Sequence, residues 1–562
     1  RSDTIRESPL GQLLRAITGN RILLYPEEKP GFVLPANLGQ KGHPVESDQS
    51  LSDSPITPAP ASYFPPGANS EGGHVQDEAN NIVGWYGPDD PSNPRNWSSW
   101  KKRLVTFQIW YMSPHIIPLH LGTQHLYTFA IYSGSSIYVP AEPQVMEYFQ
   151  VSQTKASLGL ALYVLGYGLG PLLFSPLSEV PLYGRNIPYI TSFIAFVILC
   201  VPTALVENYA GFMVLRLLQG FFGSPCLASG GASMGDMYSD IYLPLGLTSW
   251  VAAAYGGPAL GPVLSVFSIA EKGWRWAMWE ILWMGAPILI LMVFCLPETS
   301  ADNILLRRAE RLRRVTGNTR LFSQSEITQN RQKFYNMLLD SLVKPVEIMV
   351  KDPAILFANV YTSLVYGIYY SFFEAFPLTY PAKYGFDAKD VALIFISIII
   401  GCAVAVVVYI VYLYTSLMPE LKANGRRPHE HRLPPALFAS FGPTIGLFIF
   451  AWTTNGNIHW AVSALGIVLY AGSVFIVLQC VLVYLSLAYP KYEASLFAGN
   501  DISRSAVAFA FILFSRFMFI DLGIDKGVTL LAGLSILGII GMFILYFCGA
   551  GLRARSKFAE HS

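Results

Sequence analysis

Two neighbouring apolar stretches carry the residue types that could move charge through a hydrophobic layer. Residues 209–230 contain one arginine, Arg216, and residues 243–268 contain a ladder of small and helix-breaking residues. The ladder comprises Gly246, Gly257, Pro258, Gly261 and Pro262. An arginine inside a lipid-length apolar segment costs about 3 kcal/mol or more, so it normally faces a protein interior or a water-filled cavity. Proline and glycine break the hydrogen bonds of a helix. The backbone groups that lose their partners can then be satisfied only by neighbouring groups or by a cavity. Together these features predict a polar pathway through a membrane bundle.

A carboxylate near such a cation could exchange protons, because a fixed cation favours the charged form of an acid until substrate or conformation separates the two. The first apolar segment contains no acid, and Glu374 is the best-placed carboxylate elsewhere. We expect Glu374 to carry the proton or to pair with a cationic substrate. A structural acid paired near the outer face is the alternative. Asp236 and Asp501 are expected to be helix caps or gate partners, and Glu280 receives no role.

Aromatic residues precede Glu374 on the same segment. Flat aromatic faces with few fixed hydrogen-bond donors suit chemically varied apolar and cationic ligands. Packing accounts for most aromatic residues in a chain of this kind, but some are expected to line a substrate cavity. The expected cavity residues are Tyr366, Tyr369, Phe372, Phe373 and Gln219.

The composition is typical of a helical membrane protein with many spans. Of 562 residues, 52% are hydrophobic and 13% are charged, whereas soluble domains have about a quarter charged residues. The net charge of +1 carries no information about nucleic-acid or anionic partners, and we expect no nucleic-acid partner. The sequence has no P-loop, nucleophile elbow, zinc-protease motif or dinucleotide fingerprint, so we expect no enzyme activity, no catalytic residues and no ATP-driven pumping. The six cysteines show neither metal spacing nor a disulfide framework.

Apolar segments near 20 residues long predict twelve membrane-spanning helices. They cover residues 104–140, 157–178, 187–205, 209–230, 243–268, 276–296, 354–381, 390–414, 433–453, 458–485, 496–520 and 528–549. The chain then divides into five parts. These are a largely disordered cytoplasmic region at 1–100, an N-terminal six-helix bundle at 101–296, a cytoplasmic loop at 297–353, a C-terminal bundle at 354–549 and a tail at 550–562.

Basic residues concentrate in the loops on one side of this topology, which places both termini in the cytoplasm. Residues 304–315 form a basic amphipathic helix candidate. It is expected either to lie on the inner leaflet or, as we favour, to connect the two halves in solvent.

The first predicted span is longer than a bilayer needs. Its middle, residues 113–128, contains two prolines and three histidines. His115, His120 and His125 are five residues apart and share no helix face, which disfavours a metal or pH-sensing cluster. A re-entrant element and translated non-coding sequence both explain the segment, and we favour the second.

Several motifs resemble those of the major facilitator superfamily. Glu179 with Gly184 and Arg185 resembles its inner-loop signature, the segment around Arg216 resembles its fourth-span signature, and the Gly-Pro ladder looks like the fifth-span motif of its antiporters. Further pieces lie at 85–97, 273–276, 297–299, 366–377 and 552–557. In this order the motifs are similar to those of the fungal twelve-spanning drug:proton antiporters, the benomyl/fluconazole-resistance type of efflux pump, from about residue 85 to the end.

The resemblance implies an all-α fold of two six-helix bundles around a central cavity that opens alternately to each side. It implies proton-coupled export of drugs or toxic small molecules across the plasma membrane by a monomer that needs no cofactor beyond the proton gradient. Arg216 would then tune proton exchange. Glu179, Gly184 and Arg185 would form an inner gate, with Glu179 and Arg185 as a charge pair that latches the two halves.

Two departures from the family pattern bear on this expectation. Ala253 stands where the antiporter motif usually has glycine, and 113–128 interrupts the span that the family uses to line its cavity. Uptake of a nutrient or metabolite on the same fold is the first alternative function. A non-transporting membrane receptor or scaffold is the second.

Overall fold

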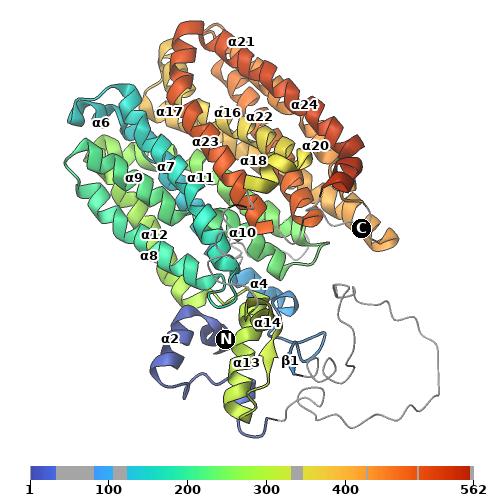
Figure 1. The fold of residues 1–562 in the computed structure, drawn as a ribbon. Helices are drawn as coiled ribbons and strands as arrows, with labels where there is room; N and C mark the ends of the chain where they lie inside the picture. The colour runs from blue at the N-terminus through green and yellow to red at the C-terminus, as the bar shows by residue number, and fades with distance from the viewer. Residues whose placement is uncertain are drawn as a thin grey trace.

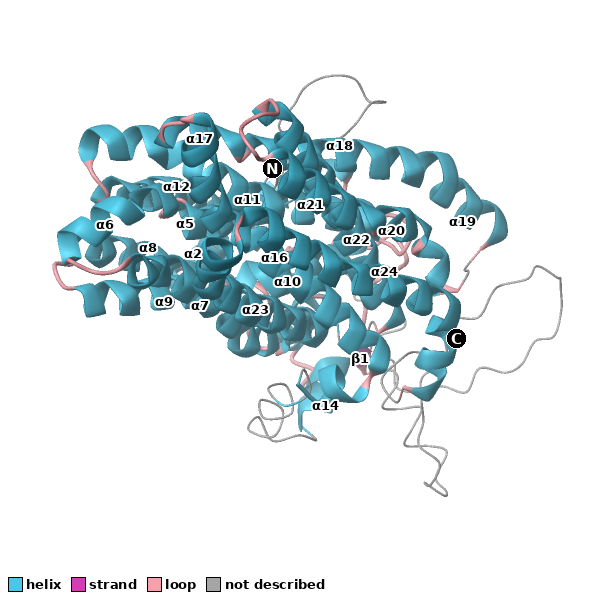
Figure 2. Cartoon of the chain, turned by 90° about the horizontal axis from the view of Figure 1, so that it is seen from above, coloured by secondary structure: helices cyan, strands magenta, loops and turns pink. Residues whose placement is uncertain are grey.

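The computed structural model describes residues 2–32, 81–105, 123–330, 343, 346–425, 428–489 and 493–556. Almost every element in these ranges is a helix (Figure 1). Two short strands, β1 (Ile82–Val83) and β2 (Phe322–Ser323), pair in parallel beside the helical body. Seen from above, the long helices lie against one another as one mass (Figure 2).

The first group of helices, which we call the N half, contains long apolar elements joined by short turns. Its bounds are α5 (Thr123–Ser136), η3 (Val139–Ala141), α6 (Glu142–Phe149), α7 (Gln153–Glu179), α8 (Asn186–Leu205), α9 (Tyr209–Gly223), α10 (Pro225–Met237), α11 (Leu243–Lys272) and α12 (Arg275–Cys295). Pro258 and Pro262 lie inside α11 and are buried against its neighbours, where packed helices can satisfy the freed backbone groups.

The second group, the C half, follows the central connection. Its bounds are α16 (Pro353–Tyr384), α17 (Ala388–Ile394), α18 (Ile396–Tyr412), η4 (Leu413–Leu417), α19 (Met418–Asn424), η5 (His429–Arg432), α20 (Pro434–Ala439), α21 (Phe441–Thr453), α22 (Trp460–Ala488), α23 (Glu493–Leu522) and α24 (Ile524–Arg555). The Asp352 carboxylate caps the start of α16 by accepting from the N–H groups of Ala354 and Ile355. Gly385, with φ of 70°, ends this helix.

Ten helical segments in the described residues are long and apolar enough to cross a membrane. They coincide with the second to sixth and the eighth to twelfth predicted spans, which confirms those predictions. The seventh is α16, which has 32 residues but is less apolar because it contains many tyrosines. The first is described only from Thr123, so residues 113–122, with His115 and His120, lie outside the described residues.

A smaller body lies at the end of the bundle that carries α13 (Ala301–Thr316), opposite the end that carries α6 (Figure 1). It combines residues 2–32 and 81–105 with α13. Its other elements are α1 (Ser2–Glu7), α2 (Pro9–Ile17), η1 (Pro26–Glu28), η2 (Pro94–Asn96), α4 (Ser99–Val105) and α14 (Gln324–Asn330). Below, the two ends are called the α13 end and the α6 end.

The expectation of disorder over 1–100 is therefore wrong for these two stretches, and α13 is neither a solvated connector nor a free amphipathic surface. Arg308 on α13 contacts Asp90 at 2.6 Å and Glu27 at 3.3 Å, and Arg311 stacks 3.7 Å from the centre of the Tyr25 ring. Composition predicted disorder because it counts charges without showing that they neutralise one another.

Candidate functional site

Helix α7 contacts the C half at both ends of the interface, through α23 at one end and through α16 at the other. At the α13 end, the Ser175 hydroxyl donates to the Ala494 carbonyl at 3.3 Å. At the α6 end, the Ser157 hydroxyl donates to Glu374 Oε1 at 2.7 Å. All four residues are buried. The two halves therefore contact each other at both ends of the interface in this conformation.

Glycines in α7 explain how the helices come this close. A Cβ on Gly168 would lie 2.3 Å from the Cβ of Ser505 on α23, and one on Gly166 would lie 2.3 Å from the Leu217 carbonyl oxygen on α9. These distances leave no room for a side chain. The Gly-x-Gly-x-Gly sequence at 166–170 therefore packs α7 against both halves.

Arg216 lies inside the N half and is fully buried. Its guanidinium donates to three backbone carbonyls, those of Gly159 at 3.0 Å, Gly134 at 3.0 Å and Ser135 at 3.1 Å. The Tyr163 ring lies 4.4 Å away. No acidic side chain in the described residues forms an ion pair with it. Neutral acceptors and an aromatic face hold this charge, so Arg216 ties α5, α7 and α9 together and faces no lipid.

A chain of hydroxyl groups leads from Arg216 across the interface. Ser135, whose carbonyl accepts from Arg216, has its hydroxyl 3.2 Å from that of Tyr370. The Tyr167 hydroxyl lies 2.9 Å from that of Tyr370 and 2.6 Å from that of Tyr366. All these side chains are buried. The two halves therefore meet at their centre through hydrogen bonds that an opening motion can break.

An ion pair that sequence reasoning missed follows on α23. Asp501 and Arg504, one turn apart, form a salt bridge, and they are 2% and 7% exposed. The Arg504 guanidinium lies 4.9 Å from the centre of the Tyr366 ring. Asp501 is thus an interior residue of α23 and not a helix cap, and its other expected role, as a gate partner, stays a prediction. An acid and a base three residues apart in an apolar helix were the available signal.

Glu374 lies among polar groups at the α6 end. It contacts Arg516 at 3.3 Å in addition to Ser157. The Ser157 hydroxyl also lies 3.1 Å from Glu142 Oε2, which accepts from Gln153 at 2.6 Å. Glu142 follows the first span directly and was not singled out from the sequence. The two carboxylates, one from each half, share one serine hydroxyl and one arginine.

The predicted inner gate has a different pairing from the one expected. Arg185 contacts Asp236 at 3.1 Å and donates to the Ser178 hydroxyl at 3.1 Å, and both partners belong to the N half. Glu179 is exposed. The expected latch between Glu179 and Arg185 stays a prediction, since the turn directs Arg185 toward Asp236 of α10 while Glu179 still interacts with Arg185 electrostatically.

Glu298 fixes the turn that carries this arginine. Its carboxylate accepts from the backbone N–H of Arg185 at 2.9 Å and of Asn186 at 3.1 Å, at the start of α8. A carboxylate is favoured at this position by the helix dipole. Gly184, with φ of 66°, lies so close that a Cβ would be 2.5 Å from Glu298 Oε2.

The antiporter motif packs α11 against α5. A Cβ on Gly257 would lie 2.7 Å from Tyr132 Cβ, and one on Gly261 would lie 2.1 Å from Ser136 Oγ. Gly246 instead packs against the Tyr238 ring. The motif thus sets the distance between the fifth span and the first.

The predicted cavity residues divide between two environments. Tyr366 reaches the N half as described, and Tyr369 donates to the Tyr255 carbonyl of α11 at 3.2 Å. Phe372 packs on Tyr470, Phe373 packs on Phe395, and both contacts stay inside the C half. Gln219 lies within the N half, 3.4 Å from Arg216.

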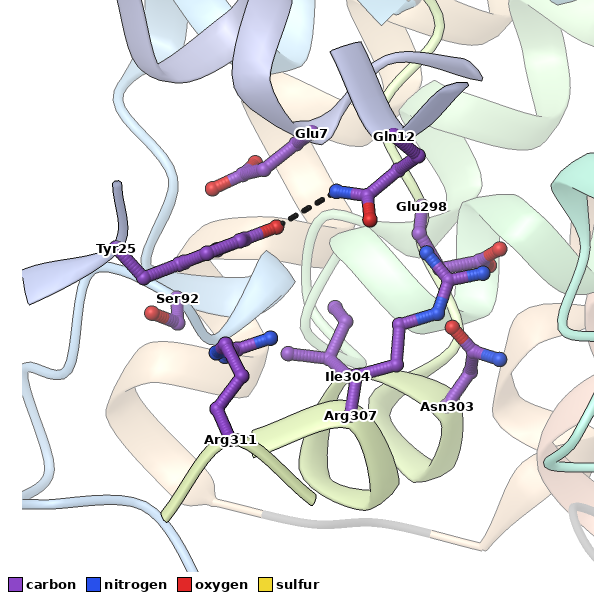
Figure 3. Close-up of a pocket in the computed structure, with 9 residues that line it drawn as sticks. All are labelled: Glu7, Gln12, Tyr25, Ser92, Glu298, Asn303, Ile304, Arg307 and Arg311. Atoms are coloured by element: carbon purple, nitrogen blue, oxygen red, sulfur yellow. Dashed lines mark hydrogen bonds between the residues drawn. The ribbon is translucent and has the colours of Figure 1, made fainter. Parts of the chain in front are cut away.

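A pocket at the α13 end is too small for a drug-like molecule. Its volume of about 30 Å³ has room for about one water molecule. Figure 3 shows side chains of residues 2–32 facing those of α13, with Gln12 Nε2 donating to the Tyr25 hydroxyl at 2.9 Å. The lining residues are Glu7, Gln12, Tyr25, Ser92, Glu298, Asn303, Ile304, Arg307 and Arg311.

Known proteins share this sequence and fold. The chain is 42% identical to the "MFS-type transporter pyvG" of Aspergillus violaceofuscus, over 99% of both chains. It is 36% identical to "Fluconazole resistance protein 1" of Saccharomyces cerevisiae over 88% of each, and 34% identical to the "Cycloheximide resistance protein" of Candida maltosa over 99% of each.

Solved structures support the fold. The human organic anion transporter MFSD10 superposes with a TM-score of 0.55 at 16% identity, over 79% of this chain and all of that one. The proton:xylose symporter XylE also gives 0.55, at 14% identity, over 75% of this chain and 94% of that one. Residues 125–500 match the family described as Major Facilitator Superfamily. The chain belongs to the Major Facilitator Superfamily of membrane transporters and is not an enzyme.

Proposed function

We propose that this protein exports drug-like or toxic small molecules in exchange for protons. Relatives over most of its length are named for resistance to fluconazole and to cycloheximide. The observation that carries the proposal is the central interface, where buried charges and hydroxyls of both halves meet and where the hydrogen-bond partners of Arg216 among the described residues are neutral. A pure scaffold would gain nothing from this arrangement, since buried charges are costly in a membrane.

Arg216 and Glu374 are proposed to couple proton movement to cargo movement. Arg216 keeps a positive charge on the side of the hydroxyl chain that faces the α6 end, and Glu374 holds a carboxylate at the α6 end itself. Because the Ser157–Glu374 hydrogen bond joins the two halves and breaks when the α6 end opens, that carboxylate can then take up a proton from the outside. The fifth-span glycines and the turn at Arg185 pack the helices of the N half tightly together, so that this half can move as a unit.

The cargo is proposed to bind between the halves once the interface opens. Tyr366 and Tyr369 then line the space, with Phe372, Phe373 and Gln219 behind them. Apolar rings with few fixed donors accept varied cargo. The α13 end, which carries most basic loops, is proposed to face the cytoplasm together with both termini, in the plasma membrane, and the protein is proposed to act as a monomer.

Nutrient uptake on the same fold remains the second candidate, since XylE, which has the same fold, is a proton:xylose symporter. The Gly-Pro ladder of α11 and the resistance relatives favour export.

The test is expression in a pump-deficient yeast, with a compound panel and with or without a protonophore. The native chain is expected to confer drug resistance that the protonophore removes. Arg216→Ala is expected to confer no resistance. Arg314→Ala is the control, because Arg314 is an exposed arginine on α13. Both variants must reach the plasma membrane. Full resistance in Arg216→Ala would refute coupling through this residue.

A further inference from the structure

The ion pair of α23 has unused hydrogen-bonding capacity at the centre of the protein. Asp501 Oδ2 and Arg504 Nε have no hydrogen-bond partner in the described residues, although both side chains are buried. A buried charged group normally satisfies its donors and acceptors. This buried acid and this buried base each have one polar atom without a hydrogen-bond partner. Such a pair indicates a site where another charged group can replace one member of the ion pair.

Aromatic residues from several helices surround this pair. Tyr366 of α16 stacks beside Arg504, and Tyr132 of α5 and Tyr255 of α11 interact with it electrostatically. Cys226 of α10 and Tyr132 of α5 are titratable groups that interact electrostatically with Asp501. From α7, the facing residue is Gly168, which lies against Ser505.

Among the described residues, Arg504 is the charged group that acts on the Asp501 carboxylate. The site therefore consists of one carboxylate, one tethered cation and three tyrosine rings, contributed by both halves. This combination matches the chemistry that recognises an organic cation, namely a carboxylate within a set of aromatic faces.

Resting on the proposed function, we propose that Asp501 is the carboxylate at which a monovalent organic cation and a proton compete, and that Arg504 is the internal cation that neutralises it when neither is bound. When the α13 end opens, the cargo cation takes the place of Arg504 against Asp501. When the α6 end opens, a proton binds Asp501 and the cargo leaves. One proton replaces one positive charge, so the exchange at this carboxylate is electroneutral, and Glu374 handles protons nearer the outside.

Proton release on cargo binding tests this assignment directly. Purified full-length protein in weakly buffered detergent solution receives tetraphenylphosphonium, and a pH dye reports the protons released. At a pH where Asp501 is protonated in the open state, the native chain is expected to release close to one proton per cation bound. Asp501→Asn is expected to release almost none and to bind the cation at least tenfold more weakly.

Glu280→Gln is the matched control. Glu280 is also a carboxylate of a membrane helix with an oxygen that lacks a hydrogen-bond partner, but it lies on α12, outside the α7–α23 interface. It is expected to release protons within twofold of the native chain. Unchanged release from Asp501→Asn, or cation binding by the native chain without proton release, would overturn the assignment.

Asp501→Asn leaves Arg504 without its ion-pair partner, so folding is checked with a second variant. The double variant Asp501→Asn/Arg504→Gln removes both charges. It is expected to keep the elution profile and melting temperature of the native chain and to lose proton release. Native-like release from the double variant would also overturn the assignment.

Failure of the assignment can be separated from failure of the proposed function. In proteoliposomes, cargo flux that a protonophore abolishes in the native chain and in Asp501→Asn alike would reject only the role of Asp501. Absence of protonophore-sensitive flux of any panel compound in the native chain would reject the proposed function and, with it, this assignment.

Discussion

The hydroxyl oxygens of Tyr167 and Tyr366 lie 2.6 Å apart and join the two halves at the centre of the protein. Tyr167 comes from α7 and Tyr366 from α16, so the bond cannot survive a rotation of one half against the other. The closed conformation is therefore held by polar contacts that water can replace, which lets it open at modest cost.

Removal of one of these hydroxyls should favour open conformations. Tyr366→Phe loses a hydrogen bond worth about 0.5–1.5 kcal/mol, which lowers the closed population relative to open forms about two- to tenfold. Distances between spin labels at the α6 ends of α7 and α23 measure this population. Tyr361→Phe, on the same helix, removes a buried hydroxyl that has no hydrogen-bond partner in the described residues, and it should leave the distances unchanged. Equal shifts in both variants would contradict the role of the Tyr167–Tyr366 bond.

The cluster at the α6 end makes a second prediction. Glu374→Gln removes the charged acceptor of the Ser157 hydroxyl, which belongs to the N half, and should weaken closure at this end, because hydrogen bonds to charged groups are stronger than neutral ones. We expect at least a tenfold loss of proton-driven transport. Transport in proteoliposomes at several external pH values measures the loss, and the variant should show a flatter pH profile. Glu147→Gln, an exposed acid on the neighbouring α6, is the control and should behave as the native chain does. An unchanged pH profile in Glu374→Gln would refute the proposed role of Glu374.

The packing of the antiporter motif predicts that a side chain at Gly261 is too large, and Gly256 on the same helix provides the control. In Gly261→Ala, the new Cβ would lie 2.1 Å from Ser136 Oγ and 2.7 Å from the Ile137 backbone nitrogen. Helix α5 must then move away from α11, with a cost of about 1–3 kcal/mol and loss of most transport. Gly256→Ala meets no atom within 4 Å and should be neutral. Melting temperature and transport rate check both variants, and a neutral Gly261→Ala would contradict the packing.

The sequence predicted most helices correctly because lipid imposes a simple rule of length and apolarity. Arg216 was recognised because a lone charge in such a segment stands out, and Glu374 for the same reason. Asp501 was expected to be a helix cap or gate partner and Arg504 was not singled out, because their setting depends on α23 packing against α7 and α16, which no local pattern reveals. The contact of Arg185 with Asp236 could not be predicted for a similar reason, since Asp236 is distant in sequence and the turn geometry brings the two together. Order in residues 2–32 and 81–105 was missed because it depends on ion pairs with α13.

These ion pairs lead to a prediction about stability and pH. Asp90 and Arg308 are both 1% exposed, so Asp90→Asn should loosen the contact of residues 81–105 with α13 by about 3–5 kcal/mol. Burial raises the pKa of Asp90, but hydrogen bonds from Arg308 and from two backbone N–H groups outweigh it, and the pKa lies below its ordinary value. The native contact is then fully stabilised above pH about 4, the ordinary value of an unfolded aspartate, and is lost as pH falls through the lower folded pKa.

Hydrogen exchange of α13 and of residues 81–97 measures this loosening. Asp89→Asn is the control, since Asp89 is the exposed neighbour. Faster exchange in Asp90→Asn at neutral pH, with no change in Asp89→Asn, is the expected result. Equal exchange in the two variants would mean that the ion pair does not hold this body in place.

The most direct test of proton-coupled export is proton flux measured together with cargo flux. Native protein is reconstituted into vesicles that contain a pH dye, and a resistance compound from the yeast panel is added to one side without an imposed gradient. Proton-coupled exchange predicts that cargo moving one way drives protons the other way, and that Arg216→Ala abolishes both movements. Cargo movement with no change of internal pH would contradict it.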